Sequence, residues 1–192
     1  MLNVLLLAIG LNLNPVETNT TYETNVSESS VVWTATKVVS GGHTGTVKIA
    51  KGSLEIEGSE LKGGSFEIDM TSIANTDIEG EWRAKLEGHL KSDDFFAVET
   101  YKTAAFKITD VKSTAKGKYN VTGDLTIKGK TESVTFPTEL TVKGNKATAT
   151  AKITIDRTKY DVRYGSPSFF DDLGDKAISN EFTLDISLIA TK

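Results

Sequence analysis

The sequence predicts an all-β protein built as an antiparallel barrel, with one amphipathic helical insertion that covers a mouth of the barrel. Two observations favour this fold. Long stretches alternate apolar and polar residues with a period of two, and short glycine-containing turns separate them. One segment alone has a helical period. A closed barrel is favoured because it leaves no exposed sheet edge, and a β-sandwich is the alternative.

The helical segment covers residues 76–96. Thr76 and Glu79 have the spacing of a capping box, in which each side chain satisfies a free backbone N–H at the helix start. A single amphipathic helix in a β-rich chain needs an apolar surface to lie on, so we expect it over the mouth of the barrel. Its apolar stripe consists of Ile78, Trp82, Leu86 and Leu90.

The first 30 residues differ from the rest in composition. Residues 1–13 are apolar, too few to span a bilayer, which needs about twenty, but long enough for the core of a signal peptide. No Lys or Arg precedes them and no A-x-A site follows. Residues 14–30 are polar and are expected to form a disordered leader. The predicted domains are therefore a signal-like segment with a disordered leader, residues 1–30, and a barrel, residues 31–192. The protein is expected to be periplasmic or secreted.

The expected strands follow from the alternation and from the turn signals between them. Gly41-Gly42, Lys51-Gly52, Lys116-Gly117, Lys128-Gly129 and Gly144-Asn145 are expected turns. Pro137 lies inside one strand and indicates an edge, a bulge or a bend, because proline cannot donate to a ladder. The expected strands are residues 31–36, 46–49, 54–56, 61–70, 104–108, 119–127, 134–142, 147–155 and 182–190.

Composition excludes several classes of function. The chain contains 0 Cys, which excludes disulfides and cysteine-based zinc or redox sites. The net charge is -4, and three of the acids lie in residues 1–30, which hold no Lys or Arg. The barrel is therefore close to neutral, without the basic surface that binding to nucleic acid or to an anionic membrane requires.

Small residues recur on inner faces of the predicted strands. A barrel filled by its own side chains would use larger residues there, so the pattern favours a hollow interior that holds a ligand. The alternative is that the small residues face large rings across the core. The small residues are Ala35, Ala104, Gly123, Ala147, Ala149 and Ala151, and the rings are Trp33, Phe66, Phe106 and Phe136.

Several strings resemble the YceI family of bacterial lipid- and polyisoprenoid-binding proteins. The most specific are LKSDDFF at 90–96 and GDLTIKG at 123–129, supported by 33–37, 42–47, 64–70 and 101–106. Lys102 stands where the family commonly has proline. The resemblance covers residues 31–191. It implies a lipocalin-like barrel, a deep apolar pocket for a long isoprenoid chain or quinone-like amphiphile, and export.

The candidate site is a ligand-binding wall, with no catalytic residue, metal or cofactor expected. Two alternatives remain open, an enzyme that acts on bound lipid with His43 or His89 as acid or base, and an interaction module with a filled barrel. No stable membrane insertion is expected, and a homodimer is left open. The candidate ligand-binding residues are Trp33, His43, Phe66, Met70, Trp82, Phe95, Phe96, Phe106, Phe136, Ala149, Phe169 and Phe170.

Charged residues near the predicted barrel ends are expected to be solvated or to form ion pairs. The acids of residues 171–175 lack EF-hand spacing and are expected in a solvated loop. Arg157 with Asp156, and Arg163 with Asp161, are expected as ion pairs at the surface or the barrel end. Contact of Arg83, Arg157 or Arg163 with an anionic head group is the alternative.

Overall fold

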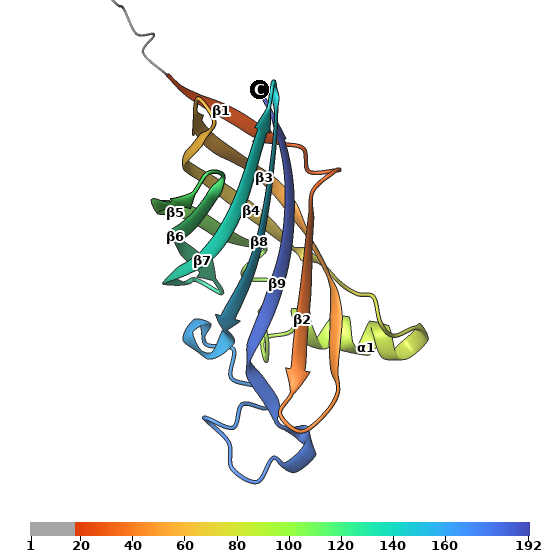
Figure 1. Ribbon diagram of the computed structural model, residues 1–192. Coiled ribbons are helices and arrows are strands. Elements are labelled where there is room, and N and C mark those ends of the chain that lie inside the picture. Colours follow the sequence, from red (N-terminus) through yellow and green to blue (C-terminus); the bar gives the residue numbers. More distant parts are fainter. Residues whose placement is uncertain (1–17) are drawn as a thin grey trace, which may run out of the picture.

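The computed structural model describes residues 18–192 as one antiparallel sheet closed on itself, with a helix at its lower end (Figure 1). The expected signal-like segment, residues 1–13, lies outside the described residues. The strands are β1 (Asn19–Thr24), β2 (Ser30–Lys37), β3 (Gly42–Glu57), β4 (Glu60–Asn75), β5 (Thr103–Ala115), β6 (Lys118–Ile127), β7 (Lys130–Lys143), β8 (Lys146–Asp156) and β9 (Ile178–Thr191). The helices are α1 (Gly80–Lys91) and the short 3-10 turns η1 (Arg157–Tyr160) and η2 (Gly174–Lys176).

Closure depends on β1 and β2 acting as one strand. Both pair antiparallel with β3, and both also pair with β9. They therefore run in the same direction and occupy one place in the wall. On the far side β3 pairs with β4, and neighbouring strands continue in order from β4 back to β9. The prediction of an antiparallel barrel is confirmed, and the sandwich alternative is wrong.

The expected disorder of residues 14–30 is wrong for β1, which lies within them. Tyr22 is 1% exposed, and its register partner on β3 is Leu54. Its hydroxyl donates to the carbonyl of Gly144 in the β7–β8 turn at 3.4 Å, which ties β1 to the upper end of the barrel. Sequence reasoning missed the strand because a single bulky side chain does not make an alternating pattern.

The expected turn at Lys51-Gly52 is also wrong, because β3 runs through it without a break. The ladder between β3 and β4 shifts register between Ile49 and Lys51, so the local irregularity is a bulge. Gly52 pairs with Phe66, and a Cβ at position 52 would collide with the ring of Phe66. The glycine thus makes room for an aromatic side chain rather than for a turn.

The β6–β7 hairpin follows the expected turn chemistry. Lys128 and Gly129 have φ of 50° and 71°, and Ile127 pairs with Lys130 across the turn. Two consecutive residues with positive φ match the twist of a tight hairpin, which is why glycine is favoured there.

Pro137 marks the position at which β7 and β8 separate. β7 pairs with β6 from one end to the other, but it pairs with β8 only from Thr138 onwards. Below that point, residues 130–137 and 152–156 diverge, and Figure 1 shows the two strands splaying apart. Tyr160 of η1 is buried near this divergence. Of the edge, bulge or bend expected at Pro137, the structure shows an edge towards β8.

The helix is shorter and more exposed than expected. α1 starts at Gly80, its N-cap residue Glu79 makes no capping bond, and the Thr76 hydroxyl donates instead to the carbonyl of Thr44. None of its residues is buried, and Trp82 is 72% exposed. The predicted capping box and the predicted burial of the stripe are therefore wrong. Only the C-terminal part of the helix, with Leu90, reaches the barrel mouth.

No helix within residues 18–192 has both the length and the apolar character to cross a bilayer.

A substitution at Gly123 tests how closely the ring of Phe106 packs against the backbone of β6. A Cβ at this position would meet the ring of Phe106 and the carbonyl of Lys107. We expect Gly123→Ala to lower the free energy of unfolding by about 1–3 kcal/mol, because the overpacked backbone must shift. Gly88→Ala is the matched control, since Gly88 lies in the exposed helix with open space around it, and it should stabilise by about 0.5–1 kcal/mol. Urea unfolding of both variants measures the difference. Equal stability of Gly123→Ala and wild type would contradict this packing.

Candidate functional site

A cavity of about 200 Å³ runs along the inside of the barrel, and every strand from β2 to β9 contributes to its wall. Its wall on β3 extends from Val47 to Leu54, roughly 23 Å of strand at about 3.3 Å per residue. A single water needs far less room, and engineered apolar cavities of comparable size bind small organic molecules. The interior is therefore large enough to hold part of a ligand.

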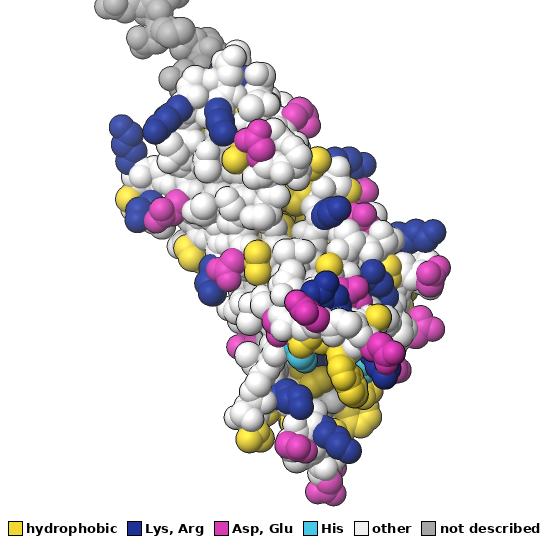
Figure 2. All heavy atoms as spheres, turned by 90° about the vertical axis from the view of Figure 1, so that its right-hand side faces the viewer, with side chains coloured by type: hydrophobic (Ala, Val, Ile, Leu, Met, Phe, Trp, Pro, Cys, Tyr) yellow, Lys and Arg dark blue, Asp and Glu magenta, His cyan; other side chains and the backbone are white. Residues whose placement is uncertain are grey.

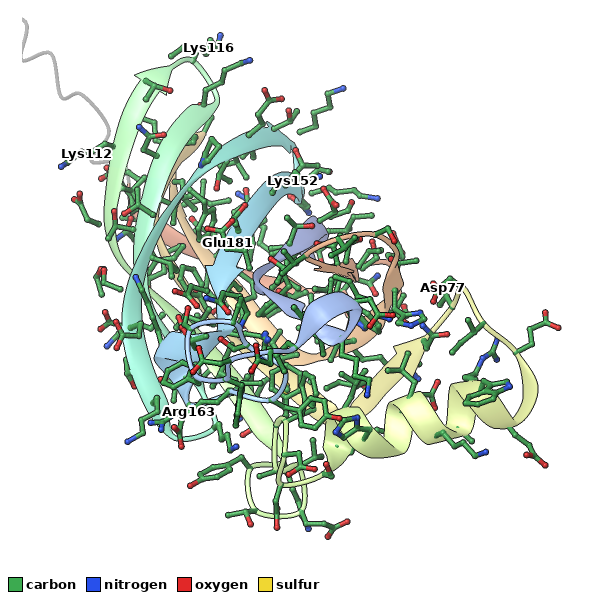
Figure 3. The ribbon with its side chains drawn as sticks, turned by 90° about the horizontal axis from the view of Figure 1, so that it is seen from below. Asp77, Lys112, Lys116, Lys152, Arg163 and Glu181 are labelled. Carbon is green, nitrogen blue, oxygen red and sulfur yellow. The ribbon has the colours of Figure 1, made fainter. Side chains whose placement is uncertain are left out.

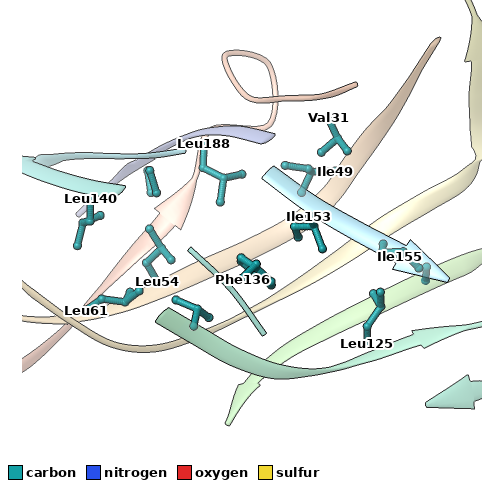
Figure 4. Close-up of a cluster of buried hydrophobic side chains, with 14 of the residues drawn as sticks. Val31, Ile49, Leu54, Leu61, Leu125, Phe136, Leu140, Ile153, Ile155 and Leu188 are labelled. Carbon is teal, nitrogen blue, oxygen red and sulfur yellow. The ribbon is translucent and has the colours of Figure 1, made fainter. Parts of the chain in front are cut away.

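The wall is almost entirely apolar. Among the described residues that form it, the polar ones are Thr138, Thr150, Ser179 and Arg157. Figure 4 shows side chains such as Val31, Ile49 and Ile153, from different strands, gathered in one cluster. A space of this kind excludes water and favours an apolar occupant.

The inner side chains of β9 indicate that the protein does not fill this space itself. Phe182, Leu184 and Ile186 alternate toward the lumen, yet all three are only half-buried. In a barrel packed solid, such residues would lose their whole surface to their neighbours. Apolar surface therefore remains accessible on the inside of the wall.

The small inner residues have two roles, at different positions. Ala104, Ala149 and Ala151 line the cavity, as the hollow interior predicts. Gly123 instead accommodates the ring of Phe106, which comes from the neighbouring strand β5 and not from across the core as the alternative expected. The small residues thus serve partly to seat rings in the wall and partly to keep the lumen open.

The structure places most of the predicted ligand-binding residues in the cavity wall, where their role in binding stays a prediction. The inner residues of β9, which the sequence analysis did not single out, also form the wall, and so does Arg157, which was expected as an ion pair or a head-group contact. The alternation along β9 could have identified its residues, but nothing local distinguishes a buried arginine from an exposed one. The predicted residues in the wall are Trp33, Phe66, Met70, Phe95, Phe96, Phe106, Phe136 and Ala149.

Four predicted site residues lie outside the cavity wall, and their role in binding stays a prediction. Trp82 is on the exposed part of α1, and Phe169 and Phe170 are 45% and 50% exposed on the loop before β9. His43 makes a hydrogen bond through Nδ1 to Asp77 at 3.2 Å instead. Sequence patterns place aromatic residues near a mouth but do not fix which way they face.

Asp77 is the acceptor for several groups at the start of the helical segment. Burial alone would raise the pKa of its carboxyl, but hydrogen bonds from Asn75, from the backbone of Thr44 and from His43 outweigh burial and lower the pKa. His43 therefore serves this polar cluster, away from the cavity.

The lower mouth is formed by the end of α1, the turn that follows it and the segment after β8. The ring of His89 packs edge-on against Phe95 and Tyr164, with centroid distances of 5.0 and 4.4 Å. Phe95 also lies against Phe96, at 6.1 Å, and both residues line the cavity. Figure 2 shows the histidines beside a patch of hydrophobic side chains at this end.

Arg157 is buried at this mouth, 4% exposed, and its expected ion pair with Asp156 is wrong. Its guanidinium donates to the carbonyls of Ser179, Val162, Tyr164 and Ile178 at 2.8–3.1 Å. The Asp156 carboxylate instead accepts from Thr158. The arginine therefore fastens the segment after β8 to the start of β9. Burial lowers the pKa of Arg157, although the charge of Asp156 acts in the opposite direction.

The other two arginines differ from Arg157. Arg163 forms the expected ion pair with Asp161, with Nε 2.7 Å from Oδ1. Arg83 donates from Nε to the carbonyl of Ile78 at 2.7 Å. Neither belongs to the cavity wall, so Arg157 is the single charged residue there among residues 18–192.

No group of three or more metal-ligating side chains is close enough to hold an ion within the described part of the chain.

A family model for the YceI-like domain matches residues 22–190. The chain belongs to the YceI-like family. The match starts at Tyr22, inside β1, in agreement with the structure rather than with the expected domain start at residue 31.

Known proteins similar to this chain share its fold over most of its length. The crystal structure of BcnA from Burkholderia cenocepacia has a TM-score of 0.72 at 23% identity and covers 88% of this chain and 99% of its own. A Saccharophagus degradans structure described as a polyisoprenoid binding domain has a TM-score of 0.64 at 16% identity, covering 88% and 97%.

Among curated sequences, a UPF0312 protein of Vibrio parahaemolyticus is 33% identical over 90 residues, which are 43% of this chain and 48% of the relative. The chain thus spans about half the length of the curated relatives it matches.

The buried Tyr160 makes the stability of the protein depend on pH. It is 1% exposed, and its hydroxyl has no hydrogen-bond partner among the described residues. Burial, and then the charges of Glu132 and Asp156, raise the pKa of Tyr160 to about 12. Between pH 10 and 12 the unfolded chain loses this proton first, so stability falls as pH rises through that window.

We expect the free energy of unfolding of the wild type to fall by about 2–3 kcal/mol by pH 12, since each pKa unit corresponds to about 1.4 kcal/mol. Tyr160→Phe should lack this part of the pH dependence and be at least as stable as wild type at neutral pH, because the hydroxyl is unpaired. Chemical unfolding of both proteins at a series of pH values measures the difference. Parallel stability curves between pH 10 and 12 would refute the prediction.

Proposed function

We propose that this protein binds and carries or sequesters an amphiphilic isoprenoid-type lipid in the barrel cavity. The observation that carries the proposal is the apolar lumen, whose inner side chains remain partly accessible. Each methylene moved from water into such a space contributes about 0.8 kcal/mol, so a long chain gains affinity from burial alone. The wall exposes almost no polar surface to this space, so binding rests on the burial of apolar groups.

The family and the similar structures support this choice of ligand. The Saccharophagus degradans domain is described as polyisoprenoid binding, and it has the same barrel. An isoprenoid is apolar along its length, which suits a narrow cavity whose walls are branched and aromatic side chains. Membership of the family supports binding over the filled interaction module.

We also propose that the protein does not act as an enzyme. Among residues 18–192, both histidines lie outside the cavity wall, and the wall contains no acid. The wall therefore holds no acid or base side chain that could transfer a proton or activate the hydroxyls of Thr138, Thr150 and Ser179. Stoichiometric binding without turnover is the function that this arrangement supports.

An exported location, periplasmic or secreted, is part of the proposal. The apolar residues 1–13 have the length of a signal-peptide core. Lipid carriage between membranes requires a protein outside the bilayer that shields the lipid from water.

A retained ligand is the first test. We expect the protein purified from a bacterial host without detergent to carry about one lipid per chain, visible by native mass spectrometry as a mass that disappears on solvent extraction. The lipid extract should contain a prenyl chain. Protein that remains free of lipid, and that also fails to bind added geranylgeraniol, would overturn the proposed function.

Ala149→Phe tests where the lipid lies. Ala149 lines the cavity, so a phenyl ring there should occupy ligand space and weaken binding of geranylgeraniol about tenfold or more. Ala105→Phe is the matched control, because Ala105 is exposed on the outer face of β5. Displacement of the fluorophore phenylnaphthylamine measures affinity, and thermal unfolding checks the fold.

If Ala149→Phe does not fold, Ala151→Phe replaces it, since Ala151 lines the cavity and is only half-buried. Unchanged affinity in a folded variant at either position would exclude the proposed location of the lipid.

A further inference from the structure

The cavity does not extend through the whole barrel. On β9, the inner residues Phe182, Leu184 and Ile186 are half-buried. Further up the same strand, Leu188 is 9% exposed and Ala190 is completely buried. Leu188 still lines the cavity, but Ala190 does not. The lumen is therefore open below the level of Leu188 and filled above it.

The neighbouring strands show the same change at the same level. On β8, Ala149 lines the cavity and Ala147 does not. Ala149 is the register partner of Leu188, and Ala147 is that of Ala190. On β7, Leu140 is the partner of Ala149, and it is buried outside the lining. The boundary between open and filled lumen therefore crosses β7, β8 and β9 at one level.

Tyr22 fills one side of the lumen above this boundary. It belongs to β1, which pairs with β9, and β9 pairs with β8. Its hydroxyl donates to the carbonyl of Gly144, in the turn between β7 and β8. The side chain therefore reaches past β9 and β8. The uppermost inner residues of those strands, Ala190 and Ala147, are small enough to leave room for its ring.

Tyr119 fills the lumen from the opposite wall. It belongs to β6, and its hydroxyl accepts from the backbone N–H of Leu61 on β4 at 3.4 Å. In the sheet β5 lies between these strands, but it pairs with β4 only through residues 103–107. The tyrosine thus bridges the part of the wall where β4 and β5 have separated. The charged side chains of Lys112 and Lys116, from the same end, lie at the edge of the molecule in Figure 3 and leave the interior to the tyrosine.

We propose that Tyr22 and Tyr119 set the longest tail that the cavity accepts, so that the protein selects prenyl lipids by chain length. We call the layer that these two side chains form the closed end. The inference rests on the proposed function and specifies the ligand class of that site. A tail enters from the lower mouth, beside Phe95 and Phe96, and its last carbons lie against the closed end. Carbons beyond that length stay in water and add no affinity.

The open part of the lumen has a depth of about four isoprene units. From Ala149 on β8 to Arg157 just after it, the lining follows about 26 Å of strand at about 3.3 Å per residue. A tilt of about 40° shortens this to about 20 Å along the barrel axis. An isoprene unit adds four bonds to an extended chain, or about 5 Å, by comparison with the three bonds between successive Cα atoms. A geranylgeranyl chain therefore fills the cavity, and a chain with one more unit exceeds it.

A series of prenyl alcohols tests this on the wild-type protein. Geraniol, farnesol, geranylgeraniol and geranylfarnesol each compete with phenylnaphthylamine. We expect the affinity to rise about tenfold or more with each unit up to geranylgeraniol, because each unit buries further apolar carbons. Geranylfarnesol should bind no more than about threefold more tightly than geranylgeraniol. A further tenfold gain at this last step would overturn the inference.

Tyr22→Leu and Tyr119→Leu each remove a ring from the closed end and should admit part of a further unit. In each variant, the affinity for geranylfarnesol relative to geranylgeraniol should be about tenfold higher than in the wild type, since one or two more carbons are buried. Tyr101→Leu is the matched control, because Tyr101 is exposed and does not line the cavity. It should keep the wild-type ratio.

Each of these comparisons uses the same two alcohols on different proteins, so differences in the solubility of the alcohols cancel. A wild-type ratio in folded Tyr22→Leu and folded Tyr119→Leu would overturn the inference. If neither variant folds, the wild-type series decides the matter.

The same series separates this inference from the proposed function. Affinity that keeps rising beyond geranylgeraniol overturns the role of the closed end and leaves the carrier function standing. Failure of all the alcohols to bind would instead overturn the carrier function.

Discussion

Closure of the sheet is the constraint on which the rest of the structure depends. β3 and β9 are held at the right spacing because β1 and β2 fill one place between them in succession. A closed antiparallel wall satisfies its backbone groups internally and leaves few edges. Once the wall is closed, its radius is set by the number of strands, and the inner side chains either fill the lumen or leave it open.

In this protein the inner side chains do both. Glycines opposite rings allow the rings to lie flat within the wall, as at Gly123 and Phe106. Alanines such as Ala149 then leave space along the axis. Apolar surface that stays accessible is unfavourable in water, so the empty barrel gives up stability that a bound chain would recover. The cavity can therefore bind a ligand because the small side chains of the wall leave space along the axis, and not because of any reactive group.

The lower end of the barrel differs from the rest because it buries polar side chains. There β7 and β8 separate, and the segment after β8 folds back with Tyr160 and Arg157 buried beneath it. Their polar atoms lie in apolar surroundings, one without a partner and one held by carbonyls alone. The unpaired hydroxyl of Tyr160 lowers stability, whereas the four carbonyls that accept from Arg157 hold the segment after β8 against the start of β9.

The sequence by itself determined which face of each strand is apolar. That was enough to predict an antiparallel barrel, most of its strands, the tight turn at Lys128-Gly129 and most of the aromatic residues of the wall. Only the tertiary structure decided that the polar segment around Tyr22 joins the sheet, that Trp82 faces solvent and that Arg157 is buried. The physical reason is that a local pattern records how a residue is oriented on its own strand or helix, whereas burial depends on what the closed wall brings opposite it.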